Sequence, residues 1–155
     1  MHIVIEGCDG TGKTTLCRLL ELATGWAYMA QSQGPPCGPR DLTNRVVRAV
    51  DSGILLPDLI SDRWPLISDC CYTGEGSLVR ISATLRLARV DRIIHCDVDD
   101  ISELRIEARE GDPADAHQTA LVRPQAPFIL DRYRHLMHEL RTLGHDVRRY
   151  RMIPR

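Results

Sequence analysis

Apolar positions recur along the chain with two alternating periods, which predict an order of strands and helices. A short β-branched run predicts a strand over 2–5, and further short runs between the helical segments predict strands over 26–30, 54–61, 92–98 and 146–152. Apolar residues at helical spacing predict helices over 14–23, 41–52, 65–72, 78–90, 100–110 and 128–143. Such alternation is typical of a parallel sheet with helices on both faces. The pattern predicts one α/β domain over residues 1–155, with three layers (α/β/α) around a central parallel sheet of five strands.

Glycine and proline mark places where the regular elements stop. Residues 31–39 contain Gly-Pro-Pro and Gly-Pro steps and predict a loop after the second strand. Residues 111–113 (Gly-Asp-Pro) are expected to end the helix over 100–110, and the small residues that follow are typical of a mobile flap. A lid segment at about residues 103–118 is therefore predicted. Pro57 places a bend or an edge position in the third strand.

Bulk composition narrows the class of protein. The chain has 155 residues and a formal net charge of −1. The overall charge therefore gives no sign of nucleic-acid binding, but it leaves a local basic groove as an alternative. Six cysteines lack the paired Cys-x-x-Cys spacing of a zinc site. No apolar run approaches membrane-spanning length, and no targeting segment precedes the first strand. We expect a cytoplasmic protein without a membrane anchor and with reduced thiols.

A phosphate-binding loop joins the first strand to the first helix. Its residues are Gly7, Cys8, Asp9, Gly10, Thr11, Gly12, Lys13 and Thr14, followed by Thr15. Glycine, four residues and Gly-Lys-Thr form the pattern whose backbone N–H groups surround the phosphates of a nucleotide at a helix N-terminus. Lys13 is expected to reach the β- and γ-phosphates, and the Thr14 hydroxyl to ligate Mg²⁺. The sequence thus predicts a P-loop NTPase fold that binds a nucleoside triphosphate.

The residues that end the third strand are candidates for the reaction itself, because ligands bind beyond the carboxyl ends of such strands. Asp62 either holds a magnesium-bound water or orients the acceptor; the alternative is that it serves as the N-cap of the helix over 65–72. Trp64 either stacks on a base or fills the core. Tyr72 either hydrogen-bonds a base or caps the helix.

Two arginines follow the fourth strand. Arg105 and Arg109 lie four residues apart, so a helix over 100–110 would place them on one face. On a closing lid, both would balance charge on the transferring phosphoryl group. The alternative is a solvated helix face on which they pair with neighbouring glutamates.

Three segments together resemble the thymidylate kinases. Residues 5–15 (IEGCDGTGKTT) resemble their E-G-x-D-G-x-G-K-T-T loop, and residues 62–64 (DRW) with Ser68 and Tyr72 resemble their D-R-[YH]…S…Y segment. Residues 96–99 (CDVD), followed by the two arginines, resemble their run into the lid. The resemblance covers about residues 1–110 and implies an ATP-dependent kinase that uses Mg²⁺ and acts on a deoxynucleotide-type acceptor.

The resemblance also implies a role for each matching residue. Lys13 and Thr14 would handle the ATP phosphates and Mg²⁺. Asp9 would touch the acceptor's sugar hydroxyl or an arginine of the site, and Arg63 would hold the acceptor phosphate or the transferring group. The expected acceptor-pocket residues are Trp64, Ser68 and Tyr72, and the expected lid arginines are Arg105 and Arg109.

One departure from the thymidylate kinases concerns the acceptor. Their second strand is followed by R-E-P-G-G-T, whose arginine grips the acceptor monophosphate, whereas residues 31–36 read QSQGPP. The next arginine is Arg40, so Arg40, Arg45 or Arg63 would have to supply the grip on a monophosphate.

A second resemblance accounts for that departure. Compact phage P-loop kinases have a G-P-P-like loop and a D-R-x-x-L-S-[ED]-x-x-Y segment, which residues 62–72 match with one inserted residue. Some members phosphorylate the hydroxymethyl group of 5-hydroxymethyluracil in DNA, an acceptor that carries no terminal phosphate.

Three functions therefore stay open. A kinase of free deoxynucleotides is favoured slightly over a DNA kinase, because the net charge is −1. The third is a P-loop switch or ATP-driven binding module. A phage-encoded chain would act in the host cytoplasm, and a homodimer stays open.

Overall fold

The computed structural model describes residues 1–30, 58–106 and 113–151, and the structural account is limited to these residues. The strands are β1 (His2–Glu6), β2 (Ala27–Ala30), β3 (Leu59–Asp62), β4 (Arg92–Asp97) and β5 (Val147–Arg151). The helices are α1 (Lys13–Thr24), α3 (Pro65–Thr73), α4 (Leu78–Leu87), α5 (Pro113–Val122) and α6 (Ala126–Thr142). Two short 3₁₀ helices are η1 (Ile101–Glu103) and η2 (Arg123–Gln125).

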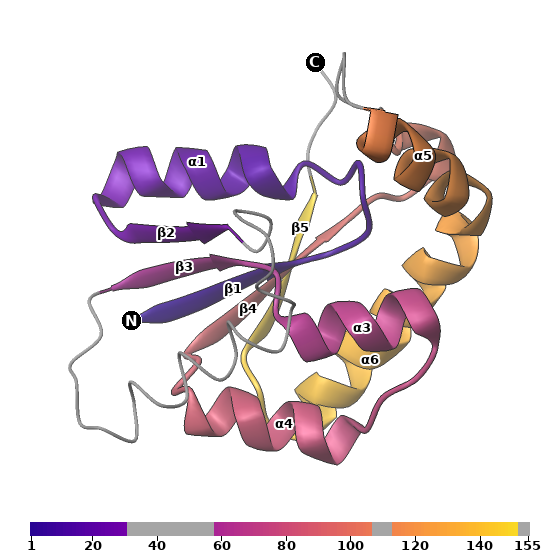
Figure 1. The fold of residues 1–155 in the computed structure, drawn as a ribbon. Helices are drawn as coiled ribbons and strands as arrows, with labels where there is room; N and C mark the ends of the chain where they lie inside the picture. The colour runs from indigo at the N-terminus through magenta and orange to yellow at the C-terminus, as the bar shows by residue number, and fades with distance from the viewer. Residues whose placement is uncertain (31–57, 107–112, 152–155) are drawn as a thin grey trace.

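The five strands form one parallel sheet in the order β2-β3-β1-β4-β5. Helix α1 covers one face, and α3, α4 and α6 cover the other (Figure 1). Strand β1 lies in the middle of the sheet, and the chain passes from its carboxyl end directly into the phosphate-binding loop. This arrangement confirms the predicted three-layer α/β/α fold around a parallel sheet of five strands.

Two cores lie on opposite faces of the sheet because successive side chains of a strand point to opposite sides. Ile3 and Ile5 pack with α1 residues Leu16 and Cys17. Val4 packs into the larger core on the other face, which includes residues of α3, α4 and α6. All five residues of β1 are buried, which explains why its sequence reads as an almost continuous apolar run.

The region after β4 differs from the prediction. A helix over 100–110 was expected; of its described residues, 100–106, only Ile101–Glu103 are helical, and residues 104–106 are not. Asp100 and Glu103 form a reciprocal capping box that starts this turn. The helix ends because Leu104 is extended and the next residue turns its backbone N–H to the Gly10 carbonyl oxygen at 3.2 Å. A tertiary contact with the phosphate-binding loop therefore overrides local helix propensity.

Helix α5 was not predicted. Pro113, which was expected to break a helix, instead begins one, and proline is well suited to the first turn because the backbone N–H that it lacks would have no intrahelical partner there. The alanines that suggested a flap are strong helix formers. The predicted loop over 31–39, the predicted helix over 41–52 and most of the predicted strand over 54–61 lie outside the described residues.

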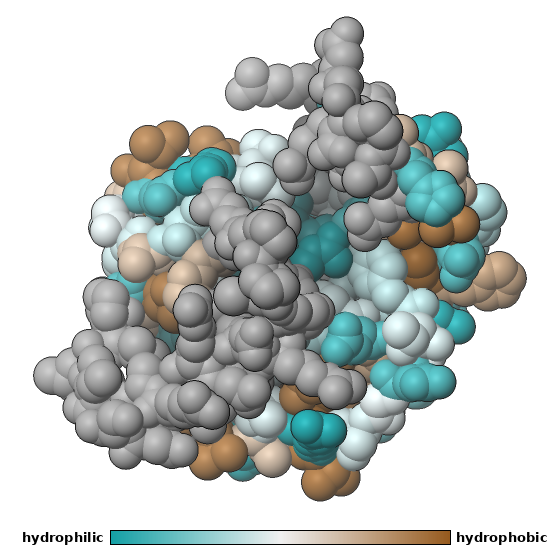
Figure 2. All heavy atoms as spheres, viewed as in Figure 1, coloured by the Kyte–Doolittle hydropathy of each residue, from teal (hydrophilic) through white to brown (hydrophobic). Residues whose placement is uncertain are grey.

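The surface carries hydrophobic side chains among its polar ones. Leu19 and Leu22 of α1 are 55% and 83% exposed, and hydrophobic residues are visible over α1 in Figure 2. Scattered apolar side chains of this kind are ordinary on a globular surface. Among the described helices, none is long and apolar enough to cross a membrane.

Candidate active site

The phosphate-binding loop fits against its surroundings because glycine occupies two crowded positions. A Cβ atom at Gly7 would collide with the Cys96 carbonyl oxygen at the end of β4. Gly10 has φ +79°, and a Cβ atom there would lie 2.7 Å from the Arg105 backbone. Both glycines therefore let the loop approach neighbouring backbone more closely than any other residue would.

Lys13 crosses this loop. Its ammonium group donates to the Cys8 carbonyl oxygen at 2.6 Å and lies 3.8 Å from the Asp9 carboxylate. The side chain is 6% exposed, and burial, with the Arg63 charge nearby, lowers the pKa of Lys13 to about 8. An anionic ligand beside Lys13 would favour its charged form. A phosphate bound beside Lys13 would therefore raise the pKa of Lys13 again and stabilise its ammonium form.

Asp62 meets two hydroxyl groups at the carboxyl end of β3. Its Oδ2 atom accepts hydrogen bonds from Thr14 at 3.1 Å and from Tyr28 at 3.0 Å. The N-cap of α3 is Trp64, whose side chain makes no capping hydrogen bond. The alternative interpretation of Asp62 as the helix N-cap is therefore wrong.

The Thr14–Asp62 pair fits a magnesium ion by its chemistry. Hydroxyl and carboxylate oxygens are hard ligands, and Mg²⁺ is usually held by one or two protein oxygens together with phosphates and water. Within the described residues, no group of three or more His, Cys, Asp or Glu side chains could hold a metal alone. The pair is therefore suited to a cation shared with bound phosphates.

Arg63 and Asp9 form an ion pair across the mouth of the loop. Burial alone would raise the pKa of Asp9, but the Arg63 and Lys13 charges outweigh burial and lower it. Arg63 is one of two non-glycine residues with positive φ in the described chain, at 79°. Such a conformation costs about 1–3 kcal/mol and persists only where the surroundings determine it. The turn at Arg63 is thus a specific feature of the site.

Tyr72 of α3 lies beside this ion pair. The Arg63 guanidinium carbon is 5.3 Å from the centre of its ring. The Tyr72 hydroxyl is buried and, among the described residues, has no hydrogen-bond partner at ordinary length. A buried hydroxyl without a partner is costly, so this group is available to hydrogen-bond a ligand.

Trp64 and Ser68 lie deeper than the resemblance implied. Trp64 is fully buried in the larger core, and its indole N–H lies 3.3 Å from the Thr84 hydroxyl. Ser68 is 7% exposed, with its hydroxyl 3.5 Å from that of Tyr133. The core interpretation of Trp64 is therefore correct, and neither side chain faces an open acceptor pocket.

The Arg105 side chain is exposed, whereas its backbone contacts the phosphate-binding loop. Because residues 104–106 are not helical, the prediction that a helix aligns Arg105 with Arg109 is wrong for the described part of this segment. Arg109 and Arg45 lie outside the described residues, so their roles stay predictions.

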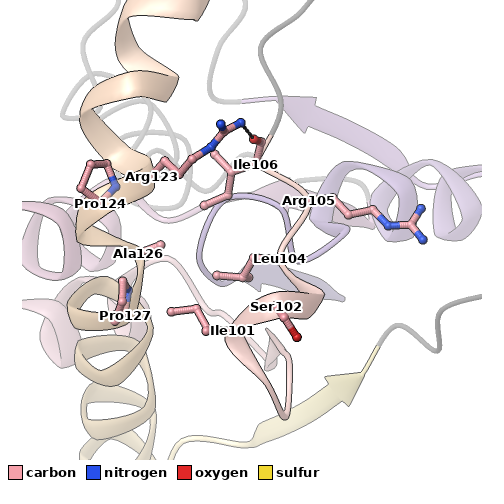
Figure 3. A pocket seen from close by; sticks show the side chains of 9 residues that line it. All are labelled: Ile101, Ser102, Leu104, Arg105, Ile106, Arg123, Pro124, Ala126 and Pro127. Carbon is pink, nitrogen blue, oxygen red and sulfur yellow. Dashed lines mark hydrogen bonds between the residues drawn. The ribbon is translucent and has the colours of Figure 1, made fainter.

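A pocket of ≈ 520 Å³ lies beside this segment (Figure 3). Its walls present polar and apolar surface in about equal parts, from the apolar residues Ile101, Leu104, Ile106, Pro124, Ala126 and Pro127 and from Ser102, Arg105 and Arg123. The Arg105 side chain points away from the other labelled side chains (Figure 3). No residue of the phosphate-binding loop lines the pocket, so it is distinct from the nucleotide site.

No role was predicted from the sequence for two residues of the site, Glu6, which appeared there only as part of the loop motif, and Tyr28. Tyr28 binds Asp62, and Glu6 is fully buried between β1, α3 and α6. Burial raises the pKa of Glu6 to about 7. A carboxylate directly after an apolar strand was a visible signal for Glu6, whereas the contact of Tyr28 depends on the pairing of β2 with β3.

Comparison with known proteins places this geometry in a fold group. No protein-family model and no curated protein match the chain by sequence. The chain is similar to the YorR protein of Bacillus subtilis, solved with phosphorylated GDP, at 16% identity and a TM-score of 0.60, covering 97% of this chain and 85% of YorR.

A second similar structure is a deoxyadenosine kinase from M. mycoides with its products dCMP and dCDP. It shares 12% identity and a TM-score of 0.59, with 97% of this chain and 90% of the kinase covered. The same kinase with bound dATP gives a TM-score of 0.55 at 15% identity, covering 97% of this chain and 91% of that one. At these identities the likeness shows the fold alone: the chain has the three-layer α/β/α fold of YorR and of this deoxyadenosine kinase, the fold that the resemblance in its sequence implied.

Proposed function

We propose that this chain is an ATP-dependent phosphotransferase that phosphorylates a deoxynucleotide-type acceptor. The observation that carries the proposal is the 3.1 Å contact between the Thr14 hydroxyl and the Asp62 carboxylate, next to the loop that holds Lys13. These three groups come from α1 and β3, and phosphoryl transfer needs each of them: a cation for the phosphates and oxygen ligands for Mg²⁺.

The charge and position of each residue suggest its role in phosphoryl transfer. Lys13 pairs with the β- and γ-phosphates, and the glycine-rich backbone directs its N–H groups at them. Thr14 and Asp62 hold Mg²⁺, which when bound neutralises charge on the phosphates. Arg63, held by Asp9, stabilises the transferring group from the acceptor side. Catalysis then rests on positioning and electrostatics, as expected for a loose phosphoryl-transfer transition state.

The acceptor site favours a hydroxyl over a monophosphate. The Tyr72 hydroxyl is buried beside the Arg63–Asp9 ion pair and has no hydrogen bond of ordinary geometry within the described residues, so it suits a hydrogen bond to a sugar or base. The sequence over 31–36 also lacks the arginine by which thymidylate kinases grip a monophosphate. The similar deoxyadenosine kinase, with dCMP as a product, supports an acceptor of this class.

The test is a transfer screen with γ-labelled ATP. The acceptors are the four deoxynucleosides, their monophosphates, plain DNA and DNA that contains 5-hydroxymethyluracil. We expect label in a deoxynucleoside or deoxynucleotide, and slower transfer to thymidine monophosphate than to the best acceptor. Lys13→Ala, checked for folding by circular dichroism, should abolish transfer. ATP hydrolysis without labelled acceptor would instead favour a P-loop ATPase or binding module.

DNA is the second candidate acceptor, favoured by the match of residues 62–72 to phage P-loop kinases. Salt separates the two candidates, because a protein that neutralises DNA phosphates releases counterions and loses affinity steeply as salt rises. Label in modified DNA with a steep salt dependence would establish the DNA kinase. A fast, saturable reaction with a free nucleotide and weak salt dependence would exclude it.

A further inference from the structure

The structure shows a buried carboxylate that the proposed transfer reaction does not use. Glu6 ends β1 and is fully buried. One carboxylate oxygen accepts the backbone N–H of Trp64, and the other accepts the Tyr133 hydroxyl at 3.2 Å. A carboxyl group is rarely fully buried unless partners offset the cost of removing it from water, so these two hydrogen bonds are what keep Glu6 in this place.

The hydrogen bonds around Arg63 show what Glu6 holds in place. The N–H of Arg63 donates to the Ile5 carbonyl oxygen at 2.9 Å, and the next N–H, that of Trp64, donates to Glu6. The two N–H groups flank the Cα atom of Arg63, whose φ is 79°. Consecutive residues of β1 therefore anchor both sides of the left-handed turn, which would otherwise be unfavourable for arginine.

The direction of the Arg63 side chain follows from this turn. With the turn in place, the guanidinium pairs with Asp9 in the phosphate-binding loop and packs over the ring of Tyr72. In an extended conformation at the same position, the Cα–Cβ bond would point elsewhere, because side-chain direction follows backbone conformation. We propose that Glu6 is a positioning residue for phosphoryl transfer, which holds the turn at Arg63 through the Trp64 N–H and so directs the guanidinium at the acceptor side of the loop.

Tyr133 provides a matched control. It donates to the second oxygen of Glu6 and is fully buried, but it has no bond to the turn at Arg63. Tyr133→Phe removes one hydrogen bond of Glu6 and leaves the Trp64 N–H paired. If Glu6 served only the packing between β1 and α6, the loss of either partner would act alike. If Glu6 positions Arg63, only loss of the oxygen that accepts the Trp64 N–H matters for turnover.

The activity test rests on the proposed function and compares Glu6→Gln with Glu6→Met. Glutamine keeps an oxygen for the Trp64 N–H and should retain most of the turnover. Methionine, of similar length, offers no such oxygen, and kcat should fall on the order of 10- to 100-fold while the KM for ATP changes little, as for other small misplacements of a reacting group. In an Arg63→Ala background, Glu6→Met should cost almost nothing further. Equal losses for glutamine and methionine, or independent losses in the double variant, would overturn the positioning role.

Hydrogen exchange gives a readout that does not depend on catalysis. The Trp64 backbone N–H should be protected in the wild type, in Glu6→Gln and in Tyr133→Phe, and should exchange faster in Glu6→Met. Unchanged protection in folded Glu6→Met would contradict the proposal even if no acceptor were known. Conversely, if protection is lost in Glu6→Met while the wild-type chain transfers no phosphate to any acceptor, the link from Glu6 to the turn is retained and the kinase function is rejected.

Discussion

Single residues at the carboxyl ends of β1 and β3 determine what this site can do. Asp62 is the clearest case, because the structure gives it two hydroxyl partners and no role in capping α3. The lysine and threonine of the loop were identified by sequence alone, since a fixed spacing dictates their place. The partners of Asp62 required the sheet, because Thr14 and Tyr28 lie far from it in the chain.

Asp62→Asn tests that role. The amide keeps the size of the side chain but loses the negative charge proposed to hold Mg²⁺, so kcat should fall on the order of 10²-fold or more, with little change in unfolding free energy. Tyr28→Phe is the control, since it removes a hydrogen bond to the same oxygen and leaves the carboxylate. Steady-state kinetics with varied Mg²⁺ would measure both, and an unchanged kcat in Asp62→Asn would make Asp62 structural.

At the scale of elements, periodicity predicted the strands and most helices, because burial of one helix face and of both faces of the sheet leaves a direct pattern in the sequence. Prediction failed where tertiary contacts decide. Residues 104–106 carry a helical pattern, yet the Arg105 N–H bonds the Gly10 carbonyl oxygen, a contact that no local pattern reveals. Pro113 was interpreted as a helix breaker although it begins α5.

That contact gives the Arg105 segment a fixed place beside the phosphate-binding loop. Arg105→Ala should therefore lower kcat more than it raises the KM for ATP, because a side chain that closes over the site acts mainly in the transition state. Arg123→Ala is a suitable comparison, because Arg123 binds the Ile106 carbonyl oxygen at 2.6 Å and supports the same segment through its backbone. Wild-type kinetics in Arg105→Ala would show that the side chain is merely solvated.

The end of β4 is held by a second ion-pair cluster. Asp97 is 5% exposed and accepts from Arg134 of α6 at 3.1 Å and from Arg149 of β5 at 2.9 Å. Asp97→Ala should destabilise the fold by about 1–3 kcal/mol, because hydrogen bonds to a buried charge are among the stronger ones. Asp99→Ala removes exposed pairs with Arg149 and Arg151 and should cost less than about 1 kcal/mol. Urea unfolding would measure the loss of unfolding free energy in both variants. Equal losses would show that the buried ion pairs of Asp97 stabilise the fold no more than the exposed pairs of Asp99.

At the scale of the whole molecule, Glu6 and His95 are two buried groups that both contact Tyr133. Burial shifts their pKa values in opposite directions. The His95 ring stacks on Tyr133 at 6.1 Å, and the Tyr133 hydroxyl binds Glu6. Burial lowers the pKa of His95 to about 4 and raises that of Glu6 to about 7. Among the described residues, the His95 Nε2 atom has no hydrogen-bond partner, which also favours the neutral ring.

The two shifts have opposite effects on stability. Glu6 binds a proton more tightly in the folded chain than in the unfolded one, so its contribution falls by about 3 kcal/mol as pH rises from its ordinary 4.5 to about 7. His95 binds a proton more weakly when folded, so its contribution rises by about 3 kcal/mol between pH 4 and its ordinary 6.5. In the wild type the two contributions largely cancel within this window.

Replacing either Glu6 or His95 should reveal the contribution of the other to the pH dependence of stability. In Glu6→Gln, the free energy of unfolding should rise more steeply than in the wild type between about pH 4.5 and 6.5, because only the His95 contribution remains. In His95→Gln the difference from wild type should reverse, with stability falling as pH increases through the same window. Lys13 does not interfere, because its lowered pKa of about 8 acts at higher pH. Urea titrations monitored by circular dichroism at several pH values would measure the slopes, and parallel profiles for wild type and Glu6→Gln would mean that Glu6 ionises as an ordinary carboxylate.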